Sequence, residues 1–270
     1  MHDLKPKRLG ALLTVSGLAI RLAYERAQAT GIELEPLLKK AGLTKQQVEN
    51  VDARLDVQCQ IRFLKLVASA LQDEFLGFHL AEQLADLQRI GLLYYVMASS
   101  DALGEALQRV VRYGAITNEG LFLKYLEGKD IRIVINYVGV ARHLDRHQIE
   151  CWLTALIRVC RKLTGRPVEP SHVRFIHRRA GNVSELAAFL GGDIKFGATV
   201  DEVVFPLSIA DVPIVSADPY LDKLLIANCE EALSRRSTRR GPFRAVVENI
   251  IARCCRTGTR ARAKLLAGVP

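Results

Sequence analysis

Apolar residues recur at helical spacing through the first hundred or so positions of the chain. Within residues 57–72 the apolar side chains fall broadly on one side of a helical projection. Gly31 and Gly42 each follow such a segment at the position where glycine commonly ends a helix, and Thr44 is a good N-cap for another helix. The pattern predicts helices over residues 10–30, 34–40, 57–72, 75–84 and 90–97, and one that begins after Ser100 or Asp101 and buries Leu103, Leu107, Val110 and Val111.

The period changes after residue 120. From Ile131 to Tyr137 apolar side chains take every second position, and Glu127-Gly128-Lys129-Asp130 separates this run from Leu121–Leu126. Two such runs around a glycine-containing turn predict an antiparallel hairpin. Further strands are predicted over residues 172–177, 194–196 and 202–205, and further helices over 149–163, 183–190 and 219–233. The expected class is α+β: a helical N-terminal part, a mixed domain with a small, mainly antiparallel sheet packed by helices, and a C-terminal helical stub.

Positive charge is concentrated at the C-terminal end. The 270-residue chain has a formal net charge of +9. Ten basic residues and one acidic residue follow Ser234, whereas residues 1–234 hold 28 of each sign. This asymmetry predicts a neutral body, a basic linker over residues 235–241, and a segment over residues 242–270 that faces a polyanion. A solvated basic tail without a partner is the alternative.

The composition is that of a globular protein, with 49% hydrophobic and 25% charged residues. No stretch of about 18 uncharged apolar residues occurs, so we expect no membrane span. The run Leu9–Ile20 follows basic residues as in a signal peptide, but it continues into Arg21, Glu25 and Arg26 at helical spacing, which favours an amphipathic helix. The six cysteines form no CxxC pair or disulfide framework. These features predict a cytoplasmic protein.

Candidate catalytic and metal-binding chemistry is sparse. His143, His147 and Cys151 stand at i, i+4 and i+8, where one helix face could present them to zinc. No fourth ligand is apparent, and surface histidines at a helix N-terminus are the favoured interpretation. Ser99-Ser100 lacks the context of a nucleophile elbow, and no glycine-rich phosphate loop occurs. We therefore expect no cofactor, no metal and no enzyme activity; a metal-dependent enzyme that uses the two histidines is the alternative.

Aromatic and neighbouring residues are the best candidates for binding a small molecule, because concave, mainly apolar pockets with a few polar groups are typical of such sites. Each could instead be an ordinary core residue. The candidates are Tyr94, Tyr95, Met97, Tyr113, Phe122, Tyr137 and Trp152.

Several short motifs follow one another in a recognisable order over about residues 15–235. They are Leu76–Ala81, Tyr94–Ser100, Leu103–Tyr113, Val173–Phe175 after Pro167, Phe189–Gly191, Ile194–Ala198, Val203–Phe205 and Ala217–Pro219. In this order they resemble the effector-binding region of AraC/XylS-type transcription regulators, in the subgroup with an arabinose-binding-like N-terminal domain. The resemblance implies that residues 1–234 bind a small-molecule effector and form a homodimer.

The resemblance lessens towards the end of the chain. Such regulators continue into a DNA-binding domain with two helix-turn-helix units, and Phe243–Arg253 resembles its first helix. Gly258 then stands where the family has a glycine before the second helix, and twelve residues follow it. We therefore expect residues 242–270 to be a truncated or out-of-frame remnant, so that this chain alone binds DNA weakly and without sequence preference. The candidate DNA contacts are Arg239, Arg240, Arg244, Arg253, Arg256, Arg260 and Arg262.

A different function is compatible with the same residues. The chain could be an orphan small-molecule-binding or dimerisation module that acts through mixed dimers with full-length relatives.

Overall fold

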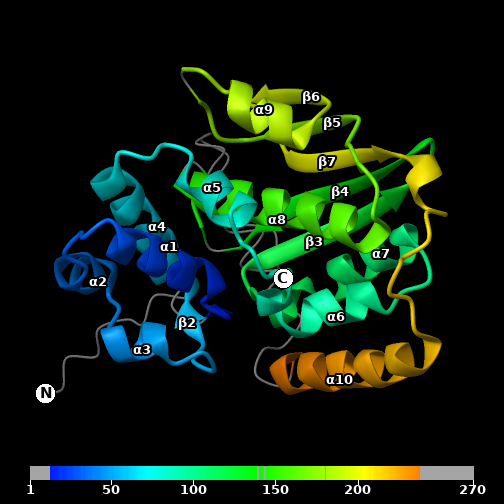
Figure 1. Ribbon diagram of the computed structural model, residues 1–270, viewed down its shortest axis with the longest axis horizontal. Coiled ribbons are helices and arrows are strands. Elements are labelled where there is room, and N and C mark those ends of the chain that lie inside the picture. The colour runs from blue at the N-terminus through cyan, green and yellow to red at the C-terminus, as the bar shows by residue number, and fades with distance from the viewer. Residues whose placement is uncertain (1–12, 139, 143, 180, 238–270) are drawn as a thin grey trace, which may run out of the picture.

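The computed structural model describes residues 13–237, except residues 139, 143 and 180. The N-terminal part is a helical lobe, drawn in shades of blue in Figure 1. Thr14 and Val15, near the start of this lobe, pair antiparallel with Leu55 and Asp56, directly before the helix that begins at Val57. The elements of this lobe are β1 (Thr14–Val15), α1 (Leu18–Ala29), α2 (Glu35–Ala41), α3 (Lys45–Glu49), β2 (Leu55–Asp56) and α4 (Val57–Leu71).

A five-stranded sheet with the order β3-β4-β7-β5-β6 organises the second half of the molecule. Its neighbouring strands are antiparallel except for the parallel pair β5 and β6. The mixed α+β class and the mainly antiparallel sheet predicted from the sequence are therefore confirmed. The strands are β3 (Leu121–Glu127), β4 (Asp130–Tyr137), β5 (His172–Phe175), β6 (Asp193–Phe196) and β7 (Asp201–Pro206).

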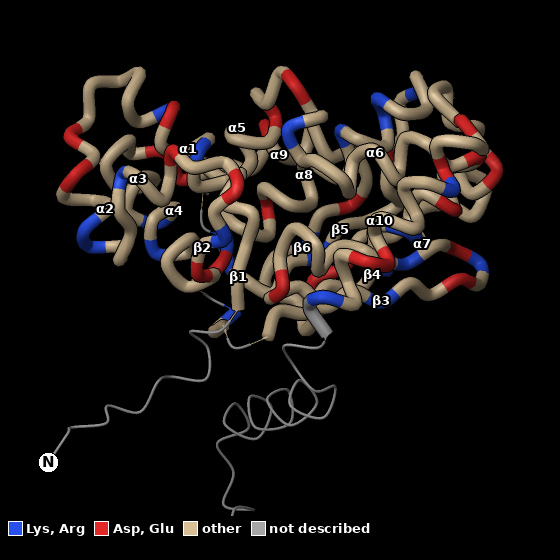
Figure 2. Tube along the Cα trace, turned by 90° about the horizontal axis from the view of Figure 1, so that it is seen from below, with Lys and Arg blue, Asp and Glu red and all other residues tan. Residues whose placement is uncertain are grey.

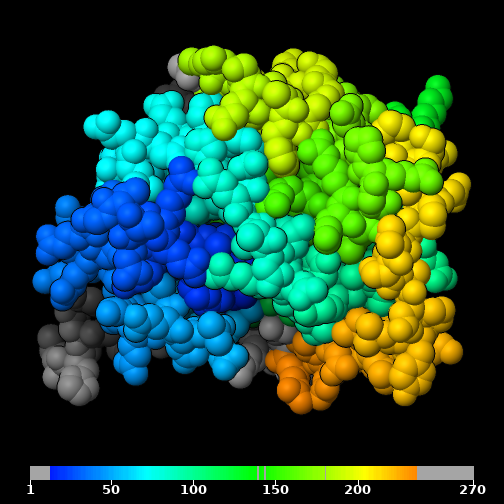
Figure 3. All heavy atoms as spheres, viewed as in Figure 1, coloured from blue at the N-terminus to red at the C-terminus, as the bar shows by residue number. Residues whose placement is uncertain are grey.

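The long helix α8 (Arg146–Thr164) crosses in front of the sheet in Figure 1 and joins the two halves of the molecule. Helix α5 (Leu76–Glu82) packs closely on α8, and α4 also contacts it. Figure 3 shows the N-terminal lobe and the sheet-bearing half in contact along a continuous boundary. The remaining elements are η2 (Leu87–Ile90), α6 (Leu92–Ala98), α7 (Leu103–Tyr113), η3 (Gly114–Ile116), α9 (Ser184–Leu190), η4 (Leu207–Ile209) and α10 (Pro219–Ser237).

Local sequence signals account for several of these elements. Thr44 and Gln47 form the reciprocal hydrogen bonds of a capping box at the start of α3. Gly165 ends α8 at φ 62°, a left-handed conformation that costs glycine little. In β4 the residues Ile131, Ile133 and Ile135 are almost fully buried, as the two-residue period predicted.

Several predicted boundaries differ from the structure by a few residues, and three of these differences have a structural consequence. The helix predicted over residues 10–30 begins only at Leu18, because Thr14 and Val15 pair with β2 instead. The N-cap of α7 is Ala102, not Ser100 or Asp101. Helix α10 continues through Ser237, so the predicted linker over residues 235–241 begins inside a helix.

The surface of the described part is mixed in charge. Positions of lysine and arginine and positions of aspartate and glutamate are interspersed along the trace in Figure 2. Among the helices of residues 13–237, none combines the length and the apolar character that crossing a bilayer requires.

Candidate ligand-binding site

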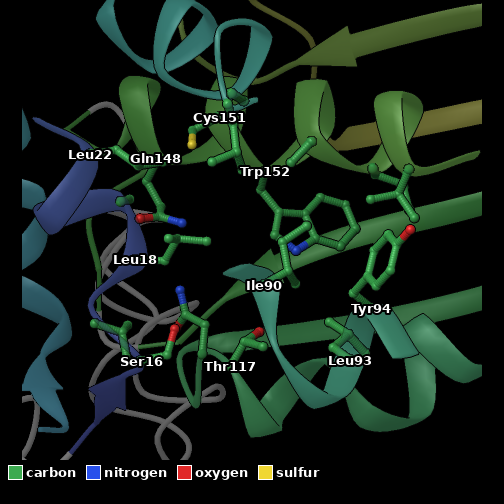
Figure 4. Close-up of a pocket in the computed structure, with 18 of the residues that line it drawn as sticks. Ser16, Leu18, Leu22, Ile90, Leu93, Tyr94, Thr117, Gln148, Cys151 and Trp152 are labelled. Carbon is green, nitrogen blue, oxygen red and sulfur yellow. The ribbon is translucent and has the colours of Figure 1, made fainter. Parts of the chain in front are cut away.

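A hollow lies between α1 of the N-terminal lobe and the helices α6 and α8 (Figure 4). The hollow and the open solvent in front of it together measure about 850 Å³. Leu18 and Leu22 of α1 face Leu93 of α6 and Trp152 of α8 across it. A mainly apolar hollow bordered by separate elements is the usual form of a small-molecule site.

Two glutamines meet in the wall of the hollow. Gln60 of α4 is 3% exposed and Gln148 of α8 is 6% exposed, and Gln60 Nε2 donates a hydrogen bond to Gln148 Oε1. In Figure 4 the side-chain amide of Gln148 lies between Leu18, Leu22 and Trp152. Burying an amide without a partner is costly, so each glutamine stabilises the other.

Asn118 and Thr117 at the other end of the hollow are hydrogen-bonded to protein atoms. Asn118 donates through Nδ2 to the Tyr137 hydroxyl at 2.5 Å and accepts the backbone N–H of Gly120 at 2.9 Å. Thr117 Oγ1 donates to the carbonyl oxygen of Gly114 at 2.9 Å. These contacts hold the loop before β3 in place beneath the hollow.

Two aromatic side chains form the side of the hollow nearest to α6. Trp152, the single tryptophan of the chain, is partly buried, and Tyr94 is 8% exposed. Burial, reinforced by the neighbouring Tyr95, raises the pKa of Tyr94. Its hydroxyl therefore stays protonated at neutral pH and can donate a hydrogen bond.

The structure brings together part of the predicted ligand-binding set. Tyr94, Met97 and Trp152 line the hollow. Tyr137 does not line the hollow itself, but its hydroxyl accepts the hydrogen bond from the lining residue Asn118.

The other three predicted residues lie away from the hollow. Tyr95 is 40% exposed and Phe122 is 49% exposed. The Tyr113 hydroxyl donates to Glu230 of α10 at 2.7 Å. The sequence analysis missed the polar residues that line the hollow, because a polar residue inside a helix or loop pattern does not indicate which cavity it faces. They are Ser16, Gln60, Thr117, Asn118 and Gln148.

A buried ion cluster supports the wall behind Tyr137. Arg142 donates to both Asp145 and Asp201, and its guanidinium lies 5.6 Å from the centroid of the Tyr137 ring. Burial raises the pKa of Asp145 to about 7, against the opposing effect of Arg142. Because Asp145 precedes α8 and Asp201 begins β7, the cluster fastens the start of α8 to the sheet.

A second buried cluster fastens α8 to the chain that follows β5. Glu150 of α8 is fully buried and accepts hydrogen bonds from His177 Nε2 at 2.8 Å and from Arg179 Nε at 2.6 Å. Arg179 also donates to the carbonyl oxygen of Glu74, before α5, at 2.8 Å. The buried glutamate is thus paired on both sides, as a buried charge requires.

The residues considered for zinc do not form a site in the described part of the chain. His147 was expected on the surface, which is wrong: it is 3% exposed, and burial lowers its pKa to about 4. Cys151 is a buried free thiol whose pKa burial raises to about 12. His143 lies outside the described residues, and within them no three histidine, cysteine or acidic side chains gather as a metal site would require.

The predicted DNA contacts also lie outside the described residues. They are Arg239, Arg240, Arg244, Arg253, Arg256, Arg260 and Arg262.

Two curated proteins are similar to this chain over most of its length. They are uncharacterized HTH-type transcriptional regulators from Mycobacterium bovis and Mycobacterium tuberculosis, each 22% identical over 230 residues. The match covers 83% of this chain and 66% of each relative, so the chain spans just under two thirds of their length.

A solved structure shares the fold. The crystal structure of the transcriptional regulator CdpR from Pseudomonas aeruginosa superposes with a TM-score of 0.57 at 15% sequence identity. The superposition covers 86% of this chain and 69% of that one.

The family assignment rests on a match over more than half of the chain. Residues 31–214 match the family described as the arabinose-binding domain of AraC transcription regulators, at their N-terminus. This stretch contains the helices α4, α6 and α8 that border the hollow. Proteins of this family are transcription regulators and typically have no enzyme activity. The chain therefore belongs to the AraC family of transcription regulators, and residues 31–214 are its arabinose-binding-like effector domain.

Proposed function

We propose that the hollow between α1, α6 and α8 is the effector site of this AraC-type regulator and that the described residues act as its sensor. The observation that carries the proposal is the hollow itself, which has mainly apolar walls and a few polar groups and is bordered by three helices. The family is named for a ligand-binding domain, which supports the same assignment.

The position of the hollow supports a sensing role. Leu18 and Leu22 on one side belong to the N-terminal lobe, while Tyr94, Met97 and Trp152 on the other belong to α6 and α8. A molecule that contacts both sides has different affinities for different relative positions of these helices. Binding would therefore shift an equilibrium between conformations, which is what a sensor must do.

Native mass spectrometry after exposure to fractionated metabolite extracts tests the proposal. Ala155 lines the hollow, so Ala155→Leu fills part of it, whereas Ala70→Leu makes the same change at an exposed position on α4. We expect a bound small molecule on the native chain and on Ala70→Leu, and none on Ala155→Leu. A molecule retained equally by all three proteins would place the effector site elsewhere.

We further propose that the chain forms a homodimer through α10. In support, Tyr220, Leu221 and Leu224 of α10 are 76%, 40% and 48% exposed, which is unusual for neighbouring large apolar residues. Sedimentation velocity should give a dimer for the native chain and a monomer for Leu224→Lys. Val51→Lys, at a residue that is 69% exposed on the N-terminal lobe, is the matched control and should remain dimeric.

The same surface would serve the alternative function, a module that pairs with full-length relatives. Co-purification with such a relative, and its loss in Leu224→Lys, would favour that function.

We also propose that the 270-residue polypeptide does not by itself select a DNA sequence. The segment Cys254–Arg260 lacks the apolar spacing of a recognition helix, while its arginines suit weak attraction to phosphates. A gel-shift titration at physiological salt should show weak binding that is equal for specific and scrambled DNA; a clear sequence preference would contradict this proposal.

A further inference from the structure

The described lining of the hollow holds no charged side chain. Its polar groups are amides, hydroxyls, a thiol and an indole N–H, and no Asp, Glu, Lys, Arg or His is among these residues. Moving an ionised group out of water into such a place is unfavourable unless an opposite charge receives it. The hollow is therefore chemically suited to an uncharged occupant.

Arginines close to the hollow direct their guanidinium groups to backbone oxygens. Arg158 donates to the carbonyl oxygens of Ala81 at 2.5 Å and Leu84 at 2.7 Å. Arg21 donates through Nη2 to the carbonyl oxygen of Ser16 at 2.6 Å. Its Nη1 is buried without a hydrogen-bond partner among the described residues, but Arg21 is not part of the lining.

Among the polar groups of the lining, the glutamine pair is the one that offers a ligand several buried N–H donors at one place. The hydrogen bond between the two side chains uses one N–H of Gln60 and the amide oxygen of Gln148. A carboxamide offers two N–H donors as well as its oxygen, so both N–H groups of Gln148 remain for another partner. The amide of Gln148 is more than nine-tenths buried and lies among the lining residues Leu18, Leu22 and Trp152 (Figure 4).

We infer that the effector is an uncharged, largely apolar molecule with a carbonyl or hydroxyl group, and that the Gln60–Gln148 pair binds this group. The inference rests on the proposed function, because it specifies the ligand of the same site. Carbonyl and hydroxyl oxygens accept the N–H groups that Gln148 offers. The apolar remainder of the ligand lies against Leu18, Leu93 and Trp152.

A free sugar does not fit this arrangement, although the family is named for arabinose. Each hydroxyl of a sugar needs a partner when it leaves water. At the far end of the hollow, Asn118 and Thr117 already use side-chain atoms in bonds to Tyr137, Gly120 and Gly114. The rest of the lining is mainly apolar and adds only the hydroxyls of Ser16 and Tyr94, the Cys151 thiol and the Trp152 indole N–H, so most sugar hydroxyls would be left without partners.

Trp152 gives a direct measurement of occupancy, because it is the only tryptophan of the chain and lines the hollow. The test is a fluorescence titration of the native chain at neutral pH with octanamide, octanoate, arabinose and toluene. Octanamide and octanoate have almost the same shape and differ in charge. We expect octanamide and toluene to shift the Trp152 emission, octanoate to bind at least about tenfold more weakly than octanamide, and arabinose to have no effect.

Substitutions then test the role of the glutamine pair. Gln148→Leu retains a side chain of similar size and should weaken octanamide binding about tenfold while leaving toluene binding unchanged. Gln46→Leu, at an exposed position of α3, is the matched control and should bind both probes as the native chain does. Retained toluene binding shows that the hollow of Gln148→Leu has not collapsed. If that variant does not fold, the titration of the native chain with the four probes still tests the inference.

The other outcomes separate this inference from the proposed function. Octanoate or arabinose binding as tightly as octanamide would overturn the inference of an uncharged, apolar effector and leave the hollow as a ligand site. Loss of octanoate binding in Arg21→Gln would then identify Arg21 as the cation that pairs with the carboxylate. Unchanged Trp152 emission with every probe would overturn both the inference and the proposed site.

Discussion

Replacing Gly77 by alanine is expected to destabilise the protein strongly, although it improves helix propensity. Gly77 lies in α5, in the Leu76-Gly77 motif that contributes to the family resemblance. A Cβ at this position would stand 2.0 Å from the carbonyl oxygen of His147 and 2.6 Å from its Cα. A carbon and a carbonyl oxygen normally approach to about 3.3 Å, so α5 and α8 would have to separate by roughly 1 Å.

The two contributions to the free energy of unfolding have opposite signs. In a helix interior, alanine is favoured over glycine by about 1 kcal/mol. Separating two packed helices forfeits contacts along the interface, and overpacking of this kind costs about 1–3 kcal/mol or more when backbone atoms obstruct the new group. Because the obstructing atoms belong to the backbone, no side-chain rotation relieves the clash, so the cost lies at the upper end of this range. A cost of about 3 kcal/mol less the gain of about 1 kcal/mol gives an expected net loss of about 2 kcal/mol.

Urea unfolding followed by far-UV circular dichroism measures this loss. Gly128→Ala is the control, since a Cβ there meets no atom within 4 Å and Gly128 is not among the glycines with positive φ. It should change the unfolding free energy by no more than about 0.5 kcal/mol. His147→Ala should not rescue Gly77→Ala, because it leaves the carbonyl oxygen in place. A Gly77→Ala protein as stable as the native chain would refute the close approach of α5 and α8.

Three further predictions concern single residues. Gln72 ends α4 at φ 53°, so Gln72→Gly should raise the free energy of unfolding by about 0.5–1 kcal/mol, and an unchanged urea midpoint would count against it. Burial lowers the pKa of His147 to about 4 from 6.5, so the unfolded chain takes up the proton first and stability falls as the pH drops through this window. His147→Gln should remove about 1.4 kcal/mol per pH unit from the slope of stability against pH between these values, which unfolding at pH 5 and pH 6 would measure. Asp222→Asn weakens the pairing of α10 with the buried Arg109, so the α10 amides should exchange with deuterium about tenfold faster while those of α8 do not change.

The sequence pattern predicts those helices and strands whose apolar periodicity can be read from residues close together in the chain. The alternation over Ile131, Ile133 and Ile135 predicted β4, and the same two-residue period explains why Phe122 of β3 points outwards while Leu121 and Leu123 are buried. The pairing of β1 with β2 was not predictable in this way. Each of these strands is only two residues long, and about forty residues separate Thr14 from its partner Asp56.

Local periodicity could find only half of the candidate site. Tyr94 and Met97 are three residues apart and share a face of α6, while Tyr95 is rotated away from that face and is exposed. The polar part of the lining depends on the contact between α4 and α8. This contact places Gln60 beside Gln148, although 88 positions of the sequence separate them. No spacing rule relates residues that distant, so the polar end of the site emerges only from the packing of the helices.

The contacts of α10 explain how an event in the hollow could reach this helix. Its apolar burial is small, since of its described side chains only Cys229 is fully buried. Partly buried apolar residues and two acidic residues attach it to the rest of the protein. Glu230 accepts hydrogen bonds from Arg112 and Tyr113 of α7, and Asp222 accepts hydrogen bonds from Arg109 of α7 and from Ser99 at the end of α6. Arg109 also donates to the carbonyl oxygen of Val96, on the same helix as the lining residues Tyr94 and Met97. Because hydrogen bonds between charged groups depend steeply on geometry, a small displacement of α6 by a ligand would change the attachment of α10 more than it would change an apolar interface.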